Sequence, residues 1–422
     1  MRVLIIAHGH PDFAKGGAEL VAYQMFIALR RRGEDAWFLA AHREQSLAYG
    51  GTPFSTLRER EILWFSPMTD YFLMAPPDRR LVWKDFQELL ERLQPEVIHF
   101  HHYLHLGVSC ILQAAHYRQM MTRPVQIVLT LHEYLAICAN DGQMIMRQTQ
   151  ELCTESSPPR CAYCFRDIGK QPEDFFLRER LFRACLARVD AFVAPSHFLK
   201  QVYVRWGLAE ERITVIENGQ PPVDKLPPRV LRASEMRGEF AYFGQINQFK
   251  GLDVLLAALV FLPKAIRKRI RVQVFGGGIE SQPETFQQTI AALRKQLGCC
   301  VVFHGSYRPE QLPGLLAMVD TVVVPSIWWE NSPLVIQEAF KYGRPVICSD
   351  IGGMREKVRH EVDGWRFVCR SPASLAEAMM RTLEPETWDK LHRNTPVPVT
   401  IDQSLENHQA IYSGKMRTDV KS

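Results

Sequence analysis

The sequence has 422 residues, of which 46% are apolar and 23% charged, so it can form two or three domains with ample cores and is not disordered as a whole. Its 51 basic and 46 acidic residues leave a formal charge of +5, too weak and too evenly spread to predict a nucleic-acid partner. The first apolar run ends at His8, too early for a signal peptide, and no other run approaches the ~18 residues that span a bilayer. We therefore expect a cytoplasmic protein.

The first half of the chain alternates short apolar runs with longer amphipathic segments. Strands are predicted at 3–7, 36–39, 97–100, 126–131, 191–194 and 214–217. Helices are predicted at 17–32, 79–93, 107–118 and 173–189. Continuous apolar strands that alternate with helices are typical of a parallel sheet covered on both faces, so this half predicts a doubly wound α/β domain.

A proline-rich segment at 218–228 predicts a linker, and the alternation then begins again. Strands are predicted at 240–244, 271–275, 301–304, 321–325 and 345–348, and helices at 252–262, 283–297, 309–318, 333–342 and 372–383. The expected fold class is α/β, with Rossmann-like parallel-sheet domains at 1–220 and 221–395 and a cleft between them as the default ligand site. The chain after Asp389 is expected to be less regular. A tail at 396–422 would hold one helix at 401–413 that packs back on the first domain, and part of it after Ser413 would be disordered.

The most informative segment runs from Glu330 to Glu338, after a predicted strand. Ser332 and Pro333 are favoured at an N-cap and at the first helical position, so a helix is expected to begin there and to offer an anion site at its N-terminus. Glu338 would lie roughly 9 Å along that helix, and a carboxylate can accept hydrogen bonds from vicinal hydroxyls. The strand and cap, rather than the glutamate spacing alone, predict a site for a molecule that carries a sugar, a diphosphate and a ribose.

Two glycine-containing turns of the second half are further candidates for binding phosphate. Gly244 and Gln245 follow a predicted strand, and Lys250 stands before the next helix, where its charge can neutralise a departing diphosphate. Gly277 follows the next strand, and a simple turn there is about as plausible as a nucleotide contact. The segment lacks the third glycine of a dinucleotide fingerprint.

In the first half, two strand ends carry candidate residues. Gly16 and Gly17 precede a helix in a long loop and let backbone N–H groups face a ligand, or they simply form a tight turn. His132 follows the fourth predicted strand, where it can reach a ligand. Four further histidines, whose spacing straddles a strand end, favour a cleft-lining or acceptor-side role over a metal site: His99, His101, His102 and His105.

With these motifs the chain resembles the family 4 retaining glycosyltransferases, also called glycosyl transferases group 1, which have the two-domain GT-B fold. The match runs from Gly-Gly-Ala-Glu at 16–19 to Gly-Gly-Met-Arg-Glu at 352–356, and Glu330 and Glu338 fit the family's E-x7-E motif. The resemblance implies that Glu330 contacts the donor sugar and Glu338 the ribose. It also implies that backbone N–H groups of the segment after the first glutamate meet the sugar and the pyrophosphate: Asn331, Ser332, Pro333, Leu334 and Val335.

The resemblance extends to three other positions. The family's T-x-H-[DE] pattern implies a donor-sugar contact at His132, and its glycine loop at 16–17 faces the donor diphosphate and the acceptor. The family places an arginine and a lysine at the turn that here holds Gln245 and Lys250. Glutamine keeps a donor but loses the charge and the fork, so leaving-group stabilisation is expected to be weaker or shared with another cation.

By resemblance, the chain is expected to be a metal-independent retaining glycosyltransferase that uses Glu330, His132 and Lys250 and needs no cofactor for catalysis. It would move a sugar from a nucleoside diphosphate sugar to a glycan or lipid-linked glycan, in bacterial surface polysaccharide assembly. Two alternatives stay open. One is another GT-B enzyme, such as a nucleotide-sugar epimerase or a hydrolase, and the other is a non-catalytic nucleotide-sugar or glycan binder, which the loss of the arginine favours.

Two features lie outside these motifs. The array C-x14-C-x7-C-x2-C, in an irregular insert at about 138–170, fits either a structural zinc site or free buried cysteines: Cys138, Cys153, Cys161 and Cys164. Basic runs at 30–32 and 264–271 and apolar segments at 62–68 and 71–76 are expected at the surface, where they would favour peripheral contact with an anionic membrane.

Overall fold

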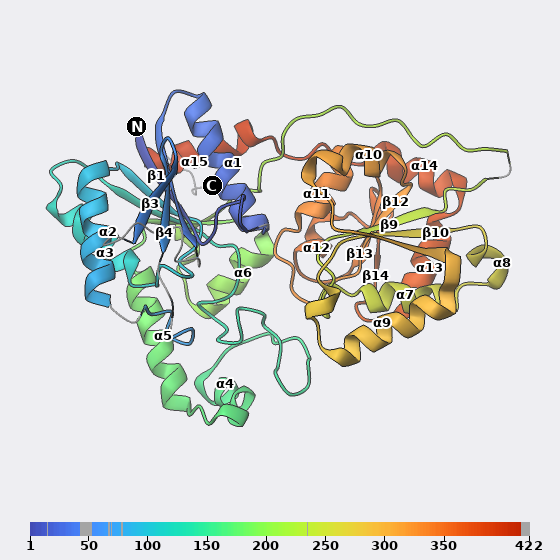
Figure 1. Ribbon diagram of the computed structural model, residues 1–422, viewed down its shortest axis with the longest axis horizontal. Helices are drawn as coiled ribbons and strands as arrows, with labels where there is room; N and C mark the ends of the chain where they lie inside the picture. The colour runs from blue at the N-terminus through green and yellow to red at the C-terminus, as the bar shows by residue number, and fades with distance from the viewer. Residues whose placement is uncertain are drawn as a thin grey trace. The chain divides into compact units, whose positions relative to one another are not determined.

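The computed structural model describes residues 1–14, 16–42, 53–65, 68, 70–76, 79–233 and 235–414. The chain divides into two compact units (Figure 1). Unit 1 is Met1–Gly219 together with the chain from Ile401 onward, and unit 2 is Gln220–Thr400. Each unit is one twisted sheet with helices on both faces, which confirms the predicted α/β fold class.

Unit 1 is built on an eight-stranded sheet in the order β3-β4-β2-β1-β5-β6-β7-β8. Its strands are β1 (Arg2–Ala7), β2 (Asp35–His42), β3 (Phe54–Arg58), β4 (Glu61–Phe65), β5 (Val97–Phe100), β6 (Gln126–Thr130), β7 (Ala191–Ala194) and β8 (Ile213–Val215). Neighbouring strands are parallel except β3 and β4, which form an antiparallel hairpin at the edge. The sequence did not predict this hairpin.

The helices of unit 1 come from both ends of the chain. They are α1 (Gly17–Arg31), α2 (Arg79–Leu93), α3 (Cys110–Met120), α4 (Pro158–Cys164), α5 (Pro172–Leu186), α6 (His197–Trp206) and α15 (Ile401–Tyr412), with short 3-10 turns at Arg166–Ile168 and Glu210–Arg212. Arg32, just after α1, donates to Asp402 and Glu406 of α15, and Leu405 packs into the same core as α1. The insert expected to be irregular contains α4.

Unit 2 is a six-stranded, wholly parallel sheet in the order β11-β10-β9-β12-β13-β14. Its strands are β9 (Glu239–Phe243), β10 (Arg271–Phe275), β11 (Val301–Gly305), β12 (Thr321–Val324), β13 (Val346–Ser349) and β14 (Gly364–Phe367). Its helices are α7 (Leu252–Phe261), α8 (Lys264–Arg267), α9 (Glu284–Leu297), α10 (Leu312–Ala317), α11 (Leu334–Lys341), α12 (Gly352–Lys357), α13 (Pro372–Thr382) and α14 (Pro385–Asn394), with 3-10 turns at Ile279–Ser281, Gly298–Cys300 and Pro309–Gln311.

The two faces of the unit 2 sheet have separate cores, because successive strand residues point to opposite sides. In β9, Phe240 and Tyr242 pack under α7, α9 and α13, whereas Ala241 and Phe243 pack under α10, α11 and α12. The segment after Asp389 is more regular than expected, because α14 continues to Asn394 and buries Trp388, which is 1% exposed.

The apolar segments near residue 70 are not the surface that the sequence predicted. Leu63 and Trp64 lie within β4 and are 2% and 0% exposed, and Met68 and Met74 are also buried. Tyr71 is the exposed exception at 47%. The predicted segment also includes Ser66 and Pro67, which lie outside the described residues, as does the chain from 415 onward, where disorder was expected.

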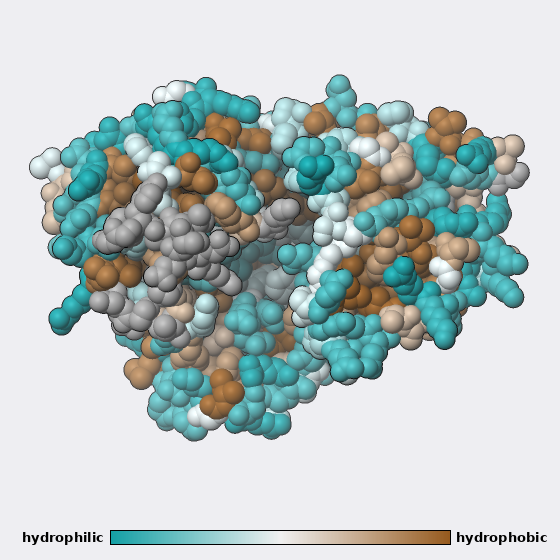
Figure 2. All heavy atoms as spheres, viewed as in Figure 1, coloured by the Kyte–Doolittle hydropathy of each residue, from teal (hydrophilic) through white to brown (hydrophobic). Residues whose placement is uncertain are grey.

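On the face seen in Figure 2, apolar residues form small groups separated by hydrophilic ones. Such scattered exposure is ordinary for a folded chain. No helix among the described residues combines the length and the apolarity that crossing a bilayer requires.

Candidate active site

The candidate anion site lies at the N-terminus of α11, in the loop that follows β12. The helix begins at Leu334, and Pro333 takes the N-cap position with no side-chain capping hydrogen bond. The expectation of a Ser332 cap is therefore wrong. Instead, the Ser332 hydroxyl is buried, with its residue 6% exposed, and has no hydrogen-bond partner among the described residues. A helix end whose first N–H groups no side chain caps, beside an unpartnered hydroxyl, can receive an anion.

Glu330 stands just before this helix end and is held by three donors. Its Oε1 accepts from Lys250 Nζ at 2.6 Å, Ser326 Oγ at 2.7 Å and Trp328 Nε1 at 2.9 Å. Burial, with the side chain 9% exposed, would raise the pKa of Glu330, but the Lys250 charge and the three hydrogen bonds outweigh it and lower the pKa. Glu330 is therefore ionised at neutral pH and has one oxygen fully engaged.

Lys250 is positioned by the turn that precedes α7. The Asn247 side-chain oxygen accepts from the Phe249 and Lys250 N–H groups at 2.9 and 3.1 Å, which closes an Asx turn. Gly251 follows with φ +69°, and a Cβ there would lie 2.0 Å from the Pro325 carbonyl oxygen. Only glycine allows this approach, so the turn brings Lys250 against the end of β12.

A second glycine fixes the loop from the other side. Gly353, in α12, donates its N–H to the Glu330 carbonyl at 2.7 Å. A Cβ on Gly353 would lie 1.8 Å from the Asn331 carbonyl oxygen. This close approach explains why a glycine stands here, and the Gly-Gly-Met run was its signal in the sequence.

Glu338 lies within α11, four residues after the helix begins. Burial raises its pKa, and the nearby Lys341 charge opposes that shift without cancelling it. Its carboxyl oxygens can accept hydrogen bonds from hydroxyl groups, so Glu338 suits a ribose more than a phosphate.

The glycine turns after β9 and β10 pack against each other. Gly244 donates to the Phe275 carbonyl, and a Cβ on Gly276 would lie 1.9 Å from the Gly244 carbonyl oxygen. Gly277 accepts from the Ile246 N–H. Gln245 is exposed, and its carbonyl accepts from Tyr242. The turn therefore has a structural role, and nothing tests a nucleotide contact at Gly277.

In unit 1, Gly16 is the N-cap residue of α1 and Gly17 its first residue. Glu19, in the first turn, is 6% exposed and lies 3.0 Å from His8 Nε2 through its Oε1. A Cβ on Gly16 would lie 2.2 Å from the other Glu19 oxygen, so this glycine makes room for the carboxylate. Lys15, in the same loop, lies outside the described residues.

His132 follows β6, is partly exposed, and has its Nε2 at 3.0 Å from His101 Nδ1. Burial and the neighbouring His8 lower the pKa of His132 to about 3, so it is neutral at neutral pH. The other histidines of the predicted cluster are almost wholly inaccessible, at 0% to 5% exposure: His99, His101, His102 and His105. These buried side chains pack at the ends of the strands and help to hold those ends in place.

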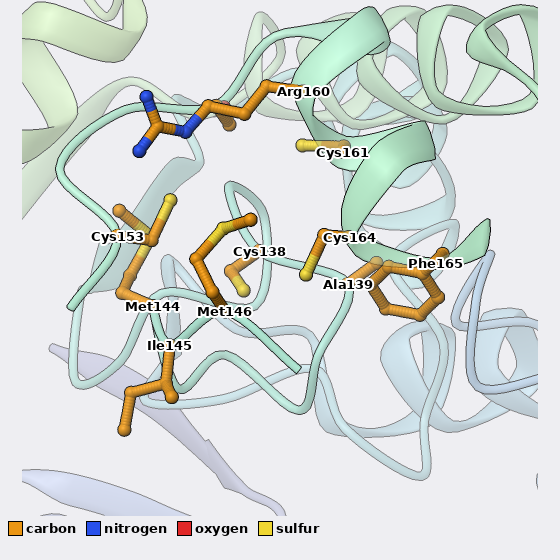
Figure 3. Close-up of a pocket in the computed structure, with 11 residues that line it drawn as sticks. Cys138, Ala139, Met144, Ile145, Met146, Cys153, Arg160, Cys161, Cys164 and Phe165 are labelled. Atoms are coloured by element: carbon orange, nitrogen blue, oxygen red, sulfur yellow. The ribbon is translucent and has the colours of Figure 1, made fainter. Parts of the chain in front are cut away.

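The four clustered cysteines line one cavity of about 20 Å³, enough for a single water-sized occupant (Figure 3). In the described part of the chain, none of the four forms a disulfide. Within the described ranges, however, no three His, Cys, Asp or Glu side chains are placed to hold one metal ion. With no metal bound, burial raises the pKa of Cys138 to about 12 and that of Cys161 to about 11. The placement of these side chains thus does not fit the predicted zinc site; Cys153 and Cys164 are buried, whereas Cys138 and Cys161 are half-buried.

The structure therefore pairs Glu330 with Lys250 in unit 2, two residues before the buried Ser332, and brings His132 close enough to Glu19 in unit 1 for their charges to interact. Sequence reasoning missed three residues that hold the first group. Asn247 carried a recognisable signal as the first residue of an Asx turn, whereas Ser326 and Trp328 became visible only once the loop was folded.

The chain matches two family models that follow one another. The model described as Glycosyltransferase Family 4 matches residues 15–222, and the model described as Glycosyl transferases group 1 matches residues 227–395. Together they cover nearly the whole chain.

Curated relatives match over shorter stretches. The chain is 28% identical over 185 residues to the lipopolysaccharide 1,2-N-acetylglucosaminetransferase of Salmonella typhimurium, covering 42% of this chain and 48% of that protein. It is 30% identical over 151 residues to the D-inositol 3-phosphate glycosyltransferase of Corynebacterium aurimucosum, covering 35% of each chain. The chain thus spans about half or less of the length of these relatives.

Solved structures match over almost the full length. Anabaena Alr3699/HepE in complex with UDP has a TM-score of 0.67 at 18% identity, over 98% of this chain and 100% of that one. The sucrose-phosphate synthase of Thermosynechococcus elongatus has a TM-score of 0.70 at 19% identity, over 98% of both chains. At these identities the likeness shows a shared fold.

Proposed function

Since the chain belongs to the GT-B glycosyltransferases of family 4 and group 1, we propose that it transfers a sugar from a nucleoside diphosphate sugar to an acceptor hydroxyl. The observation that carries the proposal is the N-terminus of α11: Lys250 pairs with Glu330 just before it, and the Ser332 hydroxyl beside it is buried with no partner among the described residues. The acceptor is a glycan or lipid-linked glycan, and the setting is bacterial surface polysaccharide assembly. Both are supported by the name of the Salmonella relative, which acts on lipopolysaccharide.

The donor diphosphate binds at the α11 helix end. Backbone N–H groups of the first turn and the Ser332 hydroxyl donate to its oxygens, and the helix dipole favours its charge. Glu338, deeper in the helix, accepts from the ribose hydroxyls, and Glu330 accepts from the sugar hydroxyls. The crystallised complexes of Alr3699/HepE with UDP and with UDP-glucose support a nucleotide sugar as the ligand class of this fold.

Lys250 changes partner when the donor binds. In the structure its ammonium group pairs with Glu330, so the two charges compensate each other. A diphosphate brings more negative charge than one carboxylate, and Lys250 then donates to the leaving phosphate as its charge grows. Gln245 contributes a neutral donor at most, so Lys250 carries the larger share of this stabilisation.

The reaction retains the anomeric configuration. The bond between the anomeric carbon and the diphosphate oxygen breaks, and the acceptor oxygen bonds to the same face of the sugar. The acceptor proton passes to the leaving phosphate. Glu330 is a poor candidate for a covalent nucleophile because one of its oxygens already accepts three hydrogen bonds. His132 contacts the donor sugar as a neutral hydrogen-bonding group.

The first experiment identifies the donor. Thermal-shift screening with UDP-, GDP-, ADP- and dTDP-sugars is expected to show one donor that raises the melting temperature, since a ligand that binds only the folded state stabilises it by mass action. With that donor, product analysis is expected to show transfer with retention, and EDTA is expected to leave the rate unchanged. Donor consumed without any acceptor would instead favour the hydrolase or epimerase alternative.

A Glu330→Gln variant separates a transferase from a non-catalytic binder. It keeps the size of the side chain and one acceptor oxygen, but it replaces the other oxygen with an NH2 donor and loses the charge that pairs with Lys250. A transferase is expected to lose turnover severely, by about 10²-fold or more, whereas a binder has no turnover to lose. Unchanged transfer in this variant would show that the site is assigned wrongly.

We also propose peripheral contact with an anionic membrane, which fewer surface features support than the sequence predicted. Its apolar segments are largely buried and Arg32 is paired with α15, whereas Arg31, Lys264 and Lys268 of the two basic runs are exposed. Co-sedimentation with phosphatidylglycerol vesicles tests it, and absence of binding at low salt would remove it.

A further inference from the structure

His101 and His132 stand at the carboxyl ends of neighbouring parallel strands. β5 and β6 pair in register through Phe100 and Leu129, so the residues just beyond them meet at the same edge of the sheet. His101 Nδ1 lies 3.0 Å from His132 Nε2, and the two rings stack with centroids 5.3 Å apart. Two imidazole nitrogens at this distance share one hydrogen, so one ring must donate and the other must accept.

Both rings are neutral, because burial lowers the pKa of each well below its usual value. A neutral imidazole has one N–H and one lone pair. If His132 donated, the proton of His101 would sit on its Nε2. That nitrogen is fully buried and has no partner among the described residues, which would leave an orphaned N–H. If His101 donates from Nδ1, only a bare lone pair is left at its Nε2.

The buried side chain of His408 shows which of these two hydrogen-bonding outcomes occurs in the interior of the protein. Its Nδ1 lies 2.7 Å from the Ser404 carbonyl oxygen, which can only accept, so the proton of His408 is on Nδ1. Its Nε2 is then a buried lone pair with no partner in the described part of the chain. Orphaned buried N–H groups are rarer than undersatisfied acceptors, so the same choice is favoured for His101.

His101 is itself held rigidly. Its backbone N–H donates to the Ile6 carbonyl at 2.8 Å, and its ring lies 4.4 Å from that of His99. His99 in turn is fixed on both sides, by Thr130 Oγ1 and by the Tyr412 hydroxyl of α15, each at 2.7 Å. A ring clamped in this way can impose a hydrogen-bond direction on its neighbour.

We propose that His101 is a positioning residue: it donates its Nδ1 hydrogen to His132 Nε2 and thereby holds His132 in the tautomer that carries its proton on Nδ1. This inference rests on the proposed function for its catalytic meaning. His132 then meets an oxygen of the donor sugar as a hydrogen-bond donor through Nδ1. The other tautomer would present a lone pair there, which could only accept from a sugar hydroxyl and would reverse the direction of this hydrogen bond.

The direct test is nitrogen NMR of the free protein with ¹⁵N-labelled histidine, in which protonated and bare ring nitrogens resonate in separate regions. The His132 signals are assigned by their loss in His132→Gln. In the wild-type chain Nδ1 is expected to be protonated and Nε2 bare. The opposite assignment would overturn the proposal, whatever the enzyme does.

Two nearly isosteric variants give the second test. His101→Asn keeps an N–H close to the position of Nδ1, whereas His101→Leu removes it. The Leu variant is expected to release the His132 tautomer and to lower kcat by about 10- to 100-fold, the loss seen when the partner that orients a metal-bound histidine is removed, with little change in KM. The Asn variant is expected to restore the wild-type His132 tautomer and the wild-type kcat. The exposed His116 on α3, changed to Asn and to Leu, is the matched control.

Melting temperatures of the two His101 variants show whether each one folds. If the Leu variant fails to fold, the comparison of wild type with the Asn variant and the wild-type spectrum still decide the inference. An unchanged His132 tautomer in a folded Leu variant would contradict it. If the spectra agree but no nucleotide sugar is ever turned over, the proposed function fails and the tautomer assignment stands.

Discussion

Replacing Lys250 by Met should destabilise unit 2 in a pH-dependent way. The change leaves the Glu330 carboxylate 91% buried with two neutral donors in place of three partners. Breaking a buried ion pair costs ~3–5 kcal/mol, and because the Lys250 side chain is 31% exposed we reduce this to about 1–3 kcal/mol. The methionine side chain keeps most of the packing contacts made by the aliphatic part of Lys250, so the substitution removes chiefly the positive charge.

The sign with pH follows from the Glu330 pKa. In the wild-type fold this pKa is lowered, so its contribution to stability is present above the unfolded value of about 4.3 and is lost as the pH falls through the folded one. Without Lys250 its charge no longer lowers the Glu330 pKa, which therefore lies higher than in the wild-type fold. The destabilisation is therefore largest at neutral pH and disappears in acid, where Glu330 is protonated in both chains.

Urea unfolding at several pH values, in a double-mutant cycle with Glu330→Gln, measures this term. The coupling between the two positions is expected to be about 1–3 kcal/mol at pH 7.5 and to fall toward zero as the pH drops below the unfolded value of about 4.3 and through the lowered folded pKa of Glu330. A coupling that is absent at pH 7.5, or that does not change with pH, would refute the ion pair as the element that holds the loop before α11.

Three further predictions follow from other contacts. Gly353→Ala should cost about 1–3 kcal/mol of stability and weaken donor binding, because the new Cβ would overlap the Asn331 carbonyl. The control Gly314→Ala, whose Cβ would meet nothing within 4 Å, should be neutral or slightly stabilising. Equal urea midpoints for the two variants would refute this prediction. Burial lowers the pKa of His408 to about 4, so its contribution to stability should be lost as the pH drops below about 6.5, by roughly 3 kcal/mol when the loss is complete near pH 4, and His408→Asn should make the acid limb of the stability curve shallower by about that amount. Metal analysis of the purified chain should find no stoichiometric zinc at the four-cysteine cavity, and one zinc per chain would contradict the geometry.

Much of the fold could be predicted because the local periodicity of apolar residues indicates where its strands and helices lie. The bounds of β5, β10 and α2 were predicted without error, since each is a continuous apolar run or a clear amphipathic repeat between turns. β3 and β4 were missed because an edge hairpin of five-residue strands carries little periodicity.

The site was predictable to the extent that it is contiguous in sequence. Glu330 and the start of α11 lie within a few residues, so the anion site could be located, although Pro333 took the cap position expected of Ser332. The contacts that complete it join distant segments. Nothing in the local sequence around Lys250 shows that it pairs with a carboxylate 80 residues away.

The same limit applies to the histidines. Their spacing suggested a role at a strand end, but only the register of β5 against β6 places His101 beside His132. Tertiary pairing decides which of several histidines has a partner, and periodicity carries no information about it.

The central claim is that the N-terminus of α11 binds a nucleoside diphosphate. The measurement that tests it most directly is a crystal structure of the chain with the nucleoside diphosphate whose sugar raises the melting temperature most. The account predicts diphosphate oxygens within hydrogen-bond distance of Ser332 and of the first N–H groups of α11, with Lys250 moved from Glu330 toward the phosphate. A nucleotide bound elsewhere, with the Lys250–Glu330 pair intact and the Ser332 hydroxyl untouched, would contradict it.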